Sequence, residues 1–129
     1  MIIHYHNRSK LNEEKEQGAI YHDSLKSLFS VSDVLSICCP ATKETVNLIN
    51  KETVEHFPKG AVITNVARGD IVDDEALIDA LNRRKIYAAW LDVYKGELNL
   101  NPGYLKIKTA FILPHLGSAT KDTRTAMAN

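Results

Sequence analysis

Four nearly continuous apolar runs divide the chain from residue 34 onward. They cover residues 34–39, 61–66, 86–91 and 110–113, and each is stopped by proline or by polar residues. Runs of this length without in-out alternation are typical of parallel strands that are covered on both faces. We therefore expect four buried strands, with Trp90 in the core.

The first thirty residues have a weaker pattern. Residues 2–5 and 19–21 predict two short strands, and the charged segment between them, residues 10–17, is interpreted as a solvated loop. Leu25 and Leu28 follow a capping serine with the spacing of one helix face. This spacing predicts an amphipathic helix before the first long apolar run.

The segments between the long runs favour helices. Three acidic residues at 73–75 and three basic residues at 83–85 bracket an apolar face, a charge order that matches the helix dipole. Residues 53–57 predict a weaker helix, and residues 104–107 a short turn that covers the sheet. Strands that alternate with helices indicate an α/β fold with a doubly wound, mostly parallel sheet.

Composition narrows the class of protein. The 129 residues are 44% hydrophobic and 25% charged, and their formal net charge is zero. This balance is that of an ordinary globular domain and argues against nucleic acid or anionic lipid as the main partner. The longest wholly apolar stretch, residues 86–91, is far shorter than the roughly 20 residues of a membrane span. Without a signal-peptide pattern at the N-terminus, we expect a cytoplasmic protein with no membrane partner.

Candidate chemistry gathers where the apolar runs end. Ligands of an open parallel sheet bind beyond the carboxyl ends of its strands. Arg68, Glu97 and His115 all follow such ends, and Asn65 and Asp92 lie directly at them. A guanidinium can hold a carboxylate through two hydrogen bonds, and an imidazole can exchange a proton near neutral pH. Each residue taken singly could equally be an ordinary surface or loop residue.

Three motifs resemble one enzyme family in order and spacing. Residues 59–72 (KGAVITNVARGDIV), 91–97 (LDVYKGE) and 113–120 (LPHLGSAT) resemble the nucleotide-binding domain of the D-isomer-specific 2-hydroxyacid dehydrogenases. The glyoxylate and hydroxypyruvate reductase branch is the most similar. The resemblance implies a Rossmann-like fold and hydride transfer between NAD(P)H and a small 2-keto or 2-hydroxy acid.

The resemblance also implies roles for the residues at the rim. Arg68 would hold the substrate carboxylate and carbonyl oxygen, His115 would be the general acid, and Glu97 would keep His115 protonated. The family usually has proline after the acid, where this chain has Leu98.

The same resemblance implies a cofactor, NADP or NAD. Arg8 follows the first predicted strand, where NAD enzymes usually carry an acid, and an arginine there suits a 2′-phosphate, which favours NADP. The residues expected to contact the cofactor are Asn7, Arg8, Ser9, Cys39, Pro40, Val66, Ala67, Asp92, Gly117 and Ser118. Cys39 could instead pack in the core. His4 and His6 alternate like a metal pair but have no third ligand at a telling spacing, so we expect no metal site.

The glycine-rich phosphate loop is not found in this sequence. No two of its six glycines are separated by a single residue, so G-x-G-x-x-G cannot be written. In the family this loop lies between the first two strands of the domain, upstream of Met1. We therefore expect residues 1–129 to be a partial NAD(P)-binding domain without its first strand and without the substrate domain, and to be inactive alone.

A missing central strand would leave a slot beside residues 2–5 and 34–39. We expect the chain to close it by re-pairing its N-terminal strand or by exchanging elements in a homodimer. Two other interpretations are a dinucleotide-sensing binding module similar to corepressors, and one half of a split gene whose partner supplies the loop.

Overall fold

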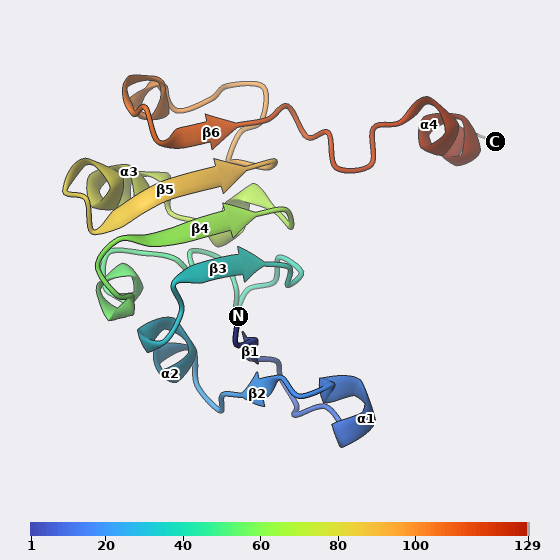
Figure 1. Cartoon of the computed structure of the whole chain (residues 1–129). Coiled ribbons are helices and arrows are strands. Elements are labelled where there is room, and N and C mark those ends of the chain that lie inside the picture. The colour runs from blue at the N-terminus through green and yellow to red at the C-terminus, as the bar shows by residue number, and fades with distance from the viewer. Residues whose placement is uncertain (129) are drawn as a thin grey trace.

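The computed structural model describes residues 1–128, which form two parallel sheets and several short helices (Figure 1). The strands are β1 (His4–Tyr5), β2 (Ile20–Tyr21), β3 (Val34–Ile37), β4 (Ala61–Asn65), β5 (Ile86–Leu91) and β6 (Ala110–Ile112). The α-helices are α1 (Glu13–Glu16), α2 (Leu25–Ser30), α3 (Asp74–Asn82) and α4 (Lys121–Ala128). Three 3₁₀ turns are η1 (Thr53–His56), η2 (Gly69–Ile71) and η3 (Pro102–Lys106). No helix among residues 1–128 has the length and apolarity needed to cross a membrane.

The strands pair in parallel throughout. The larger sheet has the order β3-β4-β5-β6, and β1 pairs with β2 in a sheet of its own. This confirms an α/β fold with parallel strands and the four strands predicted from the apolar runs. The expected re-pairing of the N-terminal strand with the third is wrong, because β1 is bound to β2 through the pairs His4–Ile20 and Tyr5–Tyr21.

The two predicted amphipathic helices are confirmed, and each begins at a side-chain cap. The Ser24 hydroxyl accepts the N–H of Ser27 at the start of α2, and the Asp73 carboxylate accepts the N–H groups of Glu75 and Ala76 at the start of α3. The solvated loop expected at residues 10–17 is wrong in part. Because the Asn12 side chain caps it, the charged segment forms the single-turn helix α1, with no buried residue. The helix expected at residues 53–57 is the 3₁₀ turn η1.

One face of the larger sheet carries the core. Ile63 of β4 and Leu91 of β5 pack in one cluster with Leu77 and Leu81 of α3. Tyr104 of η3 joins the same cluster and is almost completely buried, which confirms the turn predicted to cover the sheet. The helices α2 and α3 therefore lie on this face.

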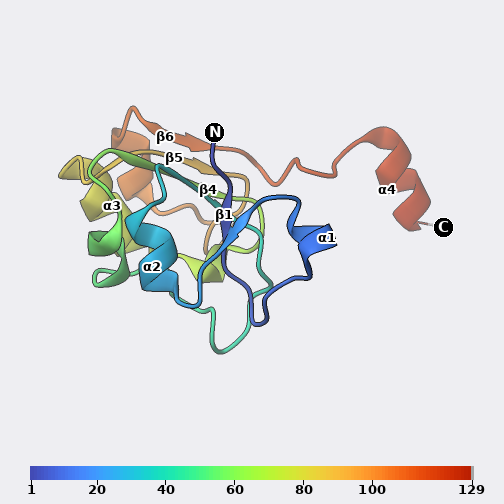
Figure 2. The same cartoon turned by 60° about the horizontal axis from the view of Figure 1, so that its bottom comes forward.

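The opposite face is open, which overturns two expectations. Exposed and buried residues alternate along β3, and Val34, Trp90 and Phe111 are 64%, 55% and 48% exposed. The prediction that both faces are covered is wrong, and so is the core position of Trp90. The reason is tertiary: no part of residues 1–128 covers these side chains, and α4, which buries none of its residues, lies at the end of an extended arm (Figures 1 and 2).

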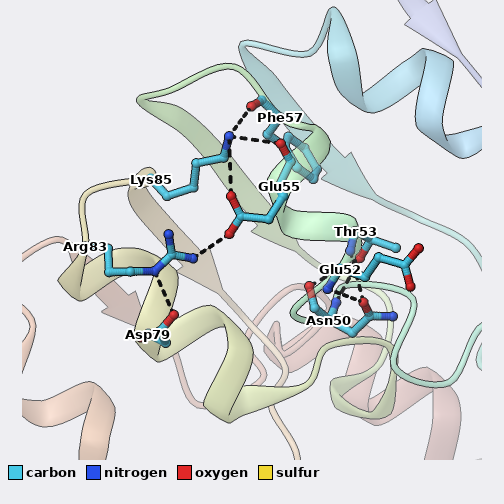
Figure 3. A network of polar contacts seen from close by, with 8 residues as sticks. All are labelled: Asn50, Glu52, Thr53, Glu55, Phe57, Asp79, Arg83 and Lys85. Carbon is cyan, nitrogen blue, oxygen red and sulfur yellow. Dashed lines mark hydrogen bonds and ion pairs between the residues drawn. The ribbon is translucent and has the colours of Figure 1, made fainter.

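A polar network joins the C-terminal end of α3 to η1 (Figure 3). The Arg83 guanidinium donates to Glu55 at 2.6 Å and to Asp79 at 2.8 Å, and the Lys85 ammonium donates to the carbonyl oxygens of Glu55 and Phe57 at 3.0 and 2.7 Å. Arg83 and Lys85 thus follow the last residue of α3 and connect this end of the helix to η1. Because the ion pairs are largely exposed, they define geometry more than they add stability.

A half-buried carboxylate in α3 makes stability depend on pH. The Tyr104 hydroxyl donates to Asp74 at 2.8 Å, and burial raises the pKa of both groups, against the lowering effect of this hydrogen bond on Asp74. The folded state therefore holds the Asp74 proton more tightly than the unfolded chain does. The resulting stabilisation is fully present below the ordinary aspartate pKa of 3.8 and is lost as pH rises through the raised value.

We expect Asp74→Asn to remove this loss while keeping an acceptor for the Tyr104 hydroxyl. Urea denaturation at several pH values between acidic and neutral measures how the free energy of unfolding depends on pH. The free energy of unfolding should fall less with rising pH in this variant than in the wild type, while the exposed control Asp23→Asn should follow the wild type. Parallel curves for Asp74→Asn and wild type would contradict the prediction.

A candidate active site at the carboxyl rim of the sheet

Asn65 shapes the turn that follows β4. Its side chain is completely buried, its oxygen accepts the N–H of Ala67 at 3.0 Å, and its amide donates to the Arg68 carbonyl oxygen at 2.8 Å. The guanidinium of Arg68 is exposed and donates to the Ala67 carbonyl oxygen at 2.7 Å. Asn65 therefore presents Val66, Ala67 and Arg68 at the end of the strand, and its own side chain is unavailable to a ligand.

Gly69 brings the loop after β4 into direct contact with the loop after β5. A Cβ atom added at Gly69 would lie 2.1 Å from the carbonyl carbon of Tyr94, a distance that no side chain tolerates. The two backbones are thus packed against each other one residue beyond Arg68. This close approach connects the loop of Arg68 to the loop that carries Glu97.

Asp92 anchors the turn that carries His115. It directly follows β5 and is only 9% exposed. Its two carboxylate oxygens accept the backbone N–H groups of Leu116 and Gly117 at 2.7 and 2.8 Å. Charge-assisted bonds of this kind are stronger than neutral ones. His115, whose φ is +55°, is thereby held in a left-handed turn beside β5.

Glu97 and His115 form a hydrogen-bonded pair. The Glu97 Oε2 atom lies 2.9 Å from His115 Nδ1, and the two side chains are 39% and 47% exposed. A carboxylate at Nδ1 favours the proton on that nitrogen and leaves Nε2 as the ring atom available to a ligand. Such a pair can hold and transfer a proton at a site that solvent and substrate can reach.

The three predicted catalytic residues are connected to different degrees. Glu97 and His115 touch each other, whereas Arg68 reaches them only through the contact of Gly69 with Tyr94. Among residues 1–128, no hydrogen bond or ion pair joins the Arg68 side chain to either of the other two.

Two hollows flank the rim. One, of about 330 Å³, lies on the open face between Val66, Trp90 and Phe111, with Asp92 at its border. The other, of about 350 Å³, is lined by His115 and Ser118 together with residues of α4. His115 therefore borders the second hollow, and Asp92, which anchors the turn of His115, borders the apolar one.

The residues predicted to select the cofactor lie at the other end of the chain. Asn7, Arg8 and Ser9 are exposed beyond β1, and the Tyr21 hydroxyl donates to the Asn7 carbonyl oxygen at 3.4 Å. The hydroxyl of Thr42 lowers the pKa of Glu44, and the charge of Arg8 adds to this effect. Arg8 thus lies within electrostatic reach of the loop that follows β3.

Two further predicted contact residues begin that loop. Cys39 is half-buried against the core, and burial raises the pKa of its thiol. Pro40 is exposed, and its carbonyl oxygen accepts the Thr45 hydroxyl at 2.8 Å. His4, one of the two alternating histidines, places Nδ1 2.8 Å from Nε2 of His22.

The positioning roles of Asn65, Gly69 and Asp92 were not predicted. The sequence marks Asn65 and Asp92 as polar residues at the ends of apolar runs, and it assigns Gly69 no role. An amide or carboxylate at the carboxyl end of a buried strand is the signal that could have found two of them. Their partners, which are backbone groups up to 25 residues away, have no signature in the sequence.

Comparison with known proteins identifies the class. The family model for the NAD-binding domain of the D-isomer specific 2-hydroxyacid dehydrogenases matches residues 1–117. The chain belongs to this family.

Its relatives include reductases and dehydrogenases of small hydroxy acids. The chain is 42% identical over 122 residues to the glycerate dehydrogenase of Hyphomicrobium methylovorum, and 45% identical over 130 residues to the glyoxylate reductase of Aeropyrum pernix. These alignments cover 95% and 99% of the chain but only 38% of either relative.

Solved structures show the same fold. The NADPH-dependent glyoxylate/hydroxypyruvate reductase of Sinorhizobium meliloti, in complex with NADP and malonate, has a TM-score of 0.92 at 33% identity, covering 98% of this chain and 39% of its own. The holo D-mandelate dehydrogenase of Rhodotorula graminis has a TM-score of 0.94 at 30% identity, covering 99% and 38%. The chain thus spans about two fifths of the length of these relatives and has a Rossmann-like, NAD-binding fold.

Proposed function

We propose that this chain forms the cofactor-binding and proton-transferring part of a reductase that uses NADPH or NADH to reduce a small 2-keto acid such as glyoxylate or hydroxypyruvate. The observation that carries the proposal is the Glu97–His115 hydrogen bond of 2.9 Å at the carboxyl rim of a parallel sheet. It supplies a proton donor whose tautomer is defined by a carboxylate. The proposal includes a doubly wound topology for the sheet.

The chemistry follows from the residues at the rim. When bound, the nicotinamide supplies a hydride to the carbonyl carbon of the substrate. His115 donates a proton from Nε2 to the carbonyl oxygen, which becomes the hydroxyl group of the product. Glu97 accepts the Nδ1 proton in a hydrogen bond and stabilises the charged imidazole before transfer. Arg68 holds the substrate carboxylate through paired hydrogen bonds and orients the carbonyl group.

The residues present suit a dinucleotide in part. The apolar hollow at Val66 and Trp90 would receive the nicotinamide ring, and Ala67 follows Val66 in the chain and would contact the same half of the cofactor. Asp92, Gly117 and Ser118 border the same rim, and Cys39 and Pro40 would line the adenosine side. The glycine-rich motif whose turn would bind the pyrophosphate does not occur in this sequence. We therefore expect the isolated chain to bind the cofactor poorly and to show no turnover.

A chimaera tests the catalytic assignment. This chain replaces the matched 38% of the Hyphomicrobium glycerate dehydrogenase, and oxidation of NADPH or NADH is followed with glyoxylate and hydroxypyruvate. We expect His115→Gln to lower kcat by about 100- to 10,000-fold, the usual contribution of a general acid. The matched exposed control Lys108→Gln should retain the kcat of the chimaera. Unchanged turnover in His115→Gln would refute the assignment.

The same chimaera tests the choice of cofactor. We expect Arg8→Ala to lower kcat/KM for NADPH by about 10- to 100-fold, because it removes a charge-assisted hydrogen bond to the 2′-phosphate. The value for NADH should change little, and the exposed control Lys26→Ala should leave both values unchanged. An equal loss with both cofactors would indicate a structural role for Arg8.

A further inference from the structure

Two tyrosine hydroxyls hold the loop that connects β1 to α1. We call residues 7–12 the β1–α1 loop. At its start, the Tyr21 hydroxyl donates to the Asn7 carbonyl oxygen at 3.4 Å, and near its end the Tyr5 hydroxyl accepts the N–H of Leu11 at 2.9 Å. Both hydroxyls belong to strands, so the loop is bonded to the two-stranded sheet on either side of its single arginine.

The register of the two strands places these hydroxyls together. Tyr5 and Tyr21 are direct partners in the parallel pairing of β1 with β2, and the centroids of their rings lie 5.3 Å apart. The His6 ring stacks on the Tyr21 ring, with 6.3 Å between the centroids. Aromatic pairs on neighbouring strands stabilise a sheet. The rings that support the loop are thus themselves fixed by packing.

A mostly buried carboxylate completes the support. The Tyr5 hydroxyl donates to Glu16 Oε1 at 2.5 Å, and the Lys10 ammonium lies 3.8 Å from the same oxygen. Although Glu16 belongs to a single-turn helix, its side chain is only 11% exposed. A carboxylate in this position needs hydrogen bonds to offset the loss of water, and the Tyr5 hydroxyl supplies one. The bonds from Leu11 to Tyr5 and from Tyr5 to Glu16 therefore join loop, strand and helix.

The arginine of this loop has a free side chain. The backbone N–H of Arg8 donates to the side-chain oxygen of Asn7 at 2.9 Å, whereas its guanidinium makes no hydrogen bond or ion pair within residues 1–128. By contrast, the guanidinium of Arg83 is bound by two carboxylates, and that of Arg68 by a carbonyl oxygen. A free guanidinium can bind a phosphate group through paired hydrogen bonds.

Support of the backbone affects binding because the ordering of a loop costs conformational entropy. Each residue that must become fixed when a ligand binds lowers the affinity, and a loop that is fixed beforehand avoids this loss. The bonds at Asn7 and Leu11 restrain the backbone on both sides of Arg8 and leave its side chain free to reach an anion. They therefore act on the affinity for the group that Arg8 binds, and not on the chemistry at the rim.

We propose that Tyr5, Tyr21 and Glu16 are positioning residues that preorganise Arg8 for the 2′-phosphate of NADPH. The inference rests on the proposed function, in which Arg8 binds this phosphate. It adds that the selection of NADPH over NADH depends on side chains that contact neither cofactor. Because NADH has a neutral hydroxyl in place of the phosphate, a displaced loop should weaken the use of NADPH and leave that of NADH nearly unchanged.

The chimaera measures this selectivity. Tyr5→Phe keeps the ring and removes the hydroxyl, and it should lower kcat/KM for NADPH by about 5- to 10-fold through a higher KM. The value for NADH and both kcat values should change little. Glu16→Gln, which keeps an acceptor for the Tyr5 hydroxyl, should retain most of the NADPH value, whereas Glu16→Ala should lose as much as Tyr5→Phe. The exposed control Tyr87→Phe, in β5, should match the unsubstituted chimaera.

Hydrogen exchange in this chain without cofactor tests the positioning directly. The Leu11 amide should exchange faster in Tyr5→Phe than in the wild type, because it loses its acceptor. Arg8→Ala should leave this exchange unchanged, since the side chain of Arg8 takes no part in holding the loop. Tyr21→Phe, which removes the longer bond, should change the cofactor selectivity of the chimaera in the same direction by a smaller factor.

The outcomes separate this inference from the proposed function. An equal loss with both cofactors in Tyr5→Phe would indicate a structural role only and would overturn the inference, as would unchanged exchange at Leu11. If Arg8→Ala lowers kcat/KM for NADPH and Tyr5→Phe does not, this inference alone is wrong. If neither variant lowers it, the assignment of Arg8 to the 2′-phosphate is wrong as well.

Discussion

Gly69→Ala is expected to destabilise the protein by about 3 kcal/mol or more, the upper range for overpacking a close contact. The added Cβ would meet the backbone of Tyr94 at 2.1 Å, and neither partner is a flexible side-chain end that could turn away. The loop after β5 would have to move. Urea denaturation followed by Trp90 fluorescence measures the change in the free energy of unfolding.

The neighbouring exposed residue offers a control in the same turn. Asp70→Ala should remain within about 0.5 kcal/mol of the wild type, as is usual for surface substitutions. Because the displaced loop also leads to Glu97, Gly69→Ala should in addition weaken the bond between Glu97 and His115. The ¹⁵N chemical shifts of the imidazole report the tautomer and would show this. Wild-type stability in Gly69→Ala would mean that the two loops are not packed as described.

Asp92→Asn is expected to release the turn that carries His115. One of the two backbone N–H groups that the carboxylate accepts would then face an NH₂ group, and a buried donor would lose its partner. We expect a loss of about 1–3 kcal/mol in the free energy of unfolding. Hydrogen exchange at the amides of Leu116 and Gly117 should become faster. The same substitution in the chimaera should lower kcat, because His115 would no longer be held in place.

The exposed carboxylate Asp122 in α4 provides the matched control. Asp122→Asn should leave amide exchange at Leu116 and Gly117 and the turnover of the chimaera unchanged. If Asp92→Asn also leaves this exchange unchanged, the anchoring role is wrong. The contact of Asp92 with the nicotinamide remains a separate prediction. Each carboxylate oxygen has a further lone pair with which it could accept a hydrogen bond from the nicotinamide amide.

Local regularity made most of the fold predictable. The four apolar runs became β3 to β6 in chain order, and the charge order around residues 73–85 became α3, capped by Asp73. These elements depend on spacing and caps within a few residues of one another. The short helix α1 was missed because charged residues near a capping asparagine look like a solvated loop.

The candidate site was predictable as residue types and not as contacts. The motifs pointed to Glu97 and His115, but the bonds of Asn65 and Asp92 to backbone groups of other turns could not be deduced. A backbone N–H group is present at nearly every position, so no residue identity marks which one a carboxylate will bind.

By itself, the sequence determined the strands, the helix caps, the family and the residue types at the carboxyl rim, because each is written in neighbouring residues or in ordered motifs. The tertiary structure alone decided that β1 pairs with β2, that Trp90 lies on an open face, and that Gly69 and Asp92 hold the loops of the rim together. Whether an apolar side chain is covered depends on which distant segments are present to pack on it, and spacing along the chain contains no information about that.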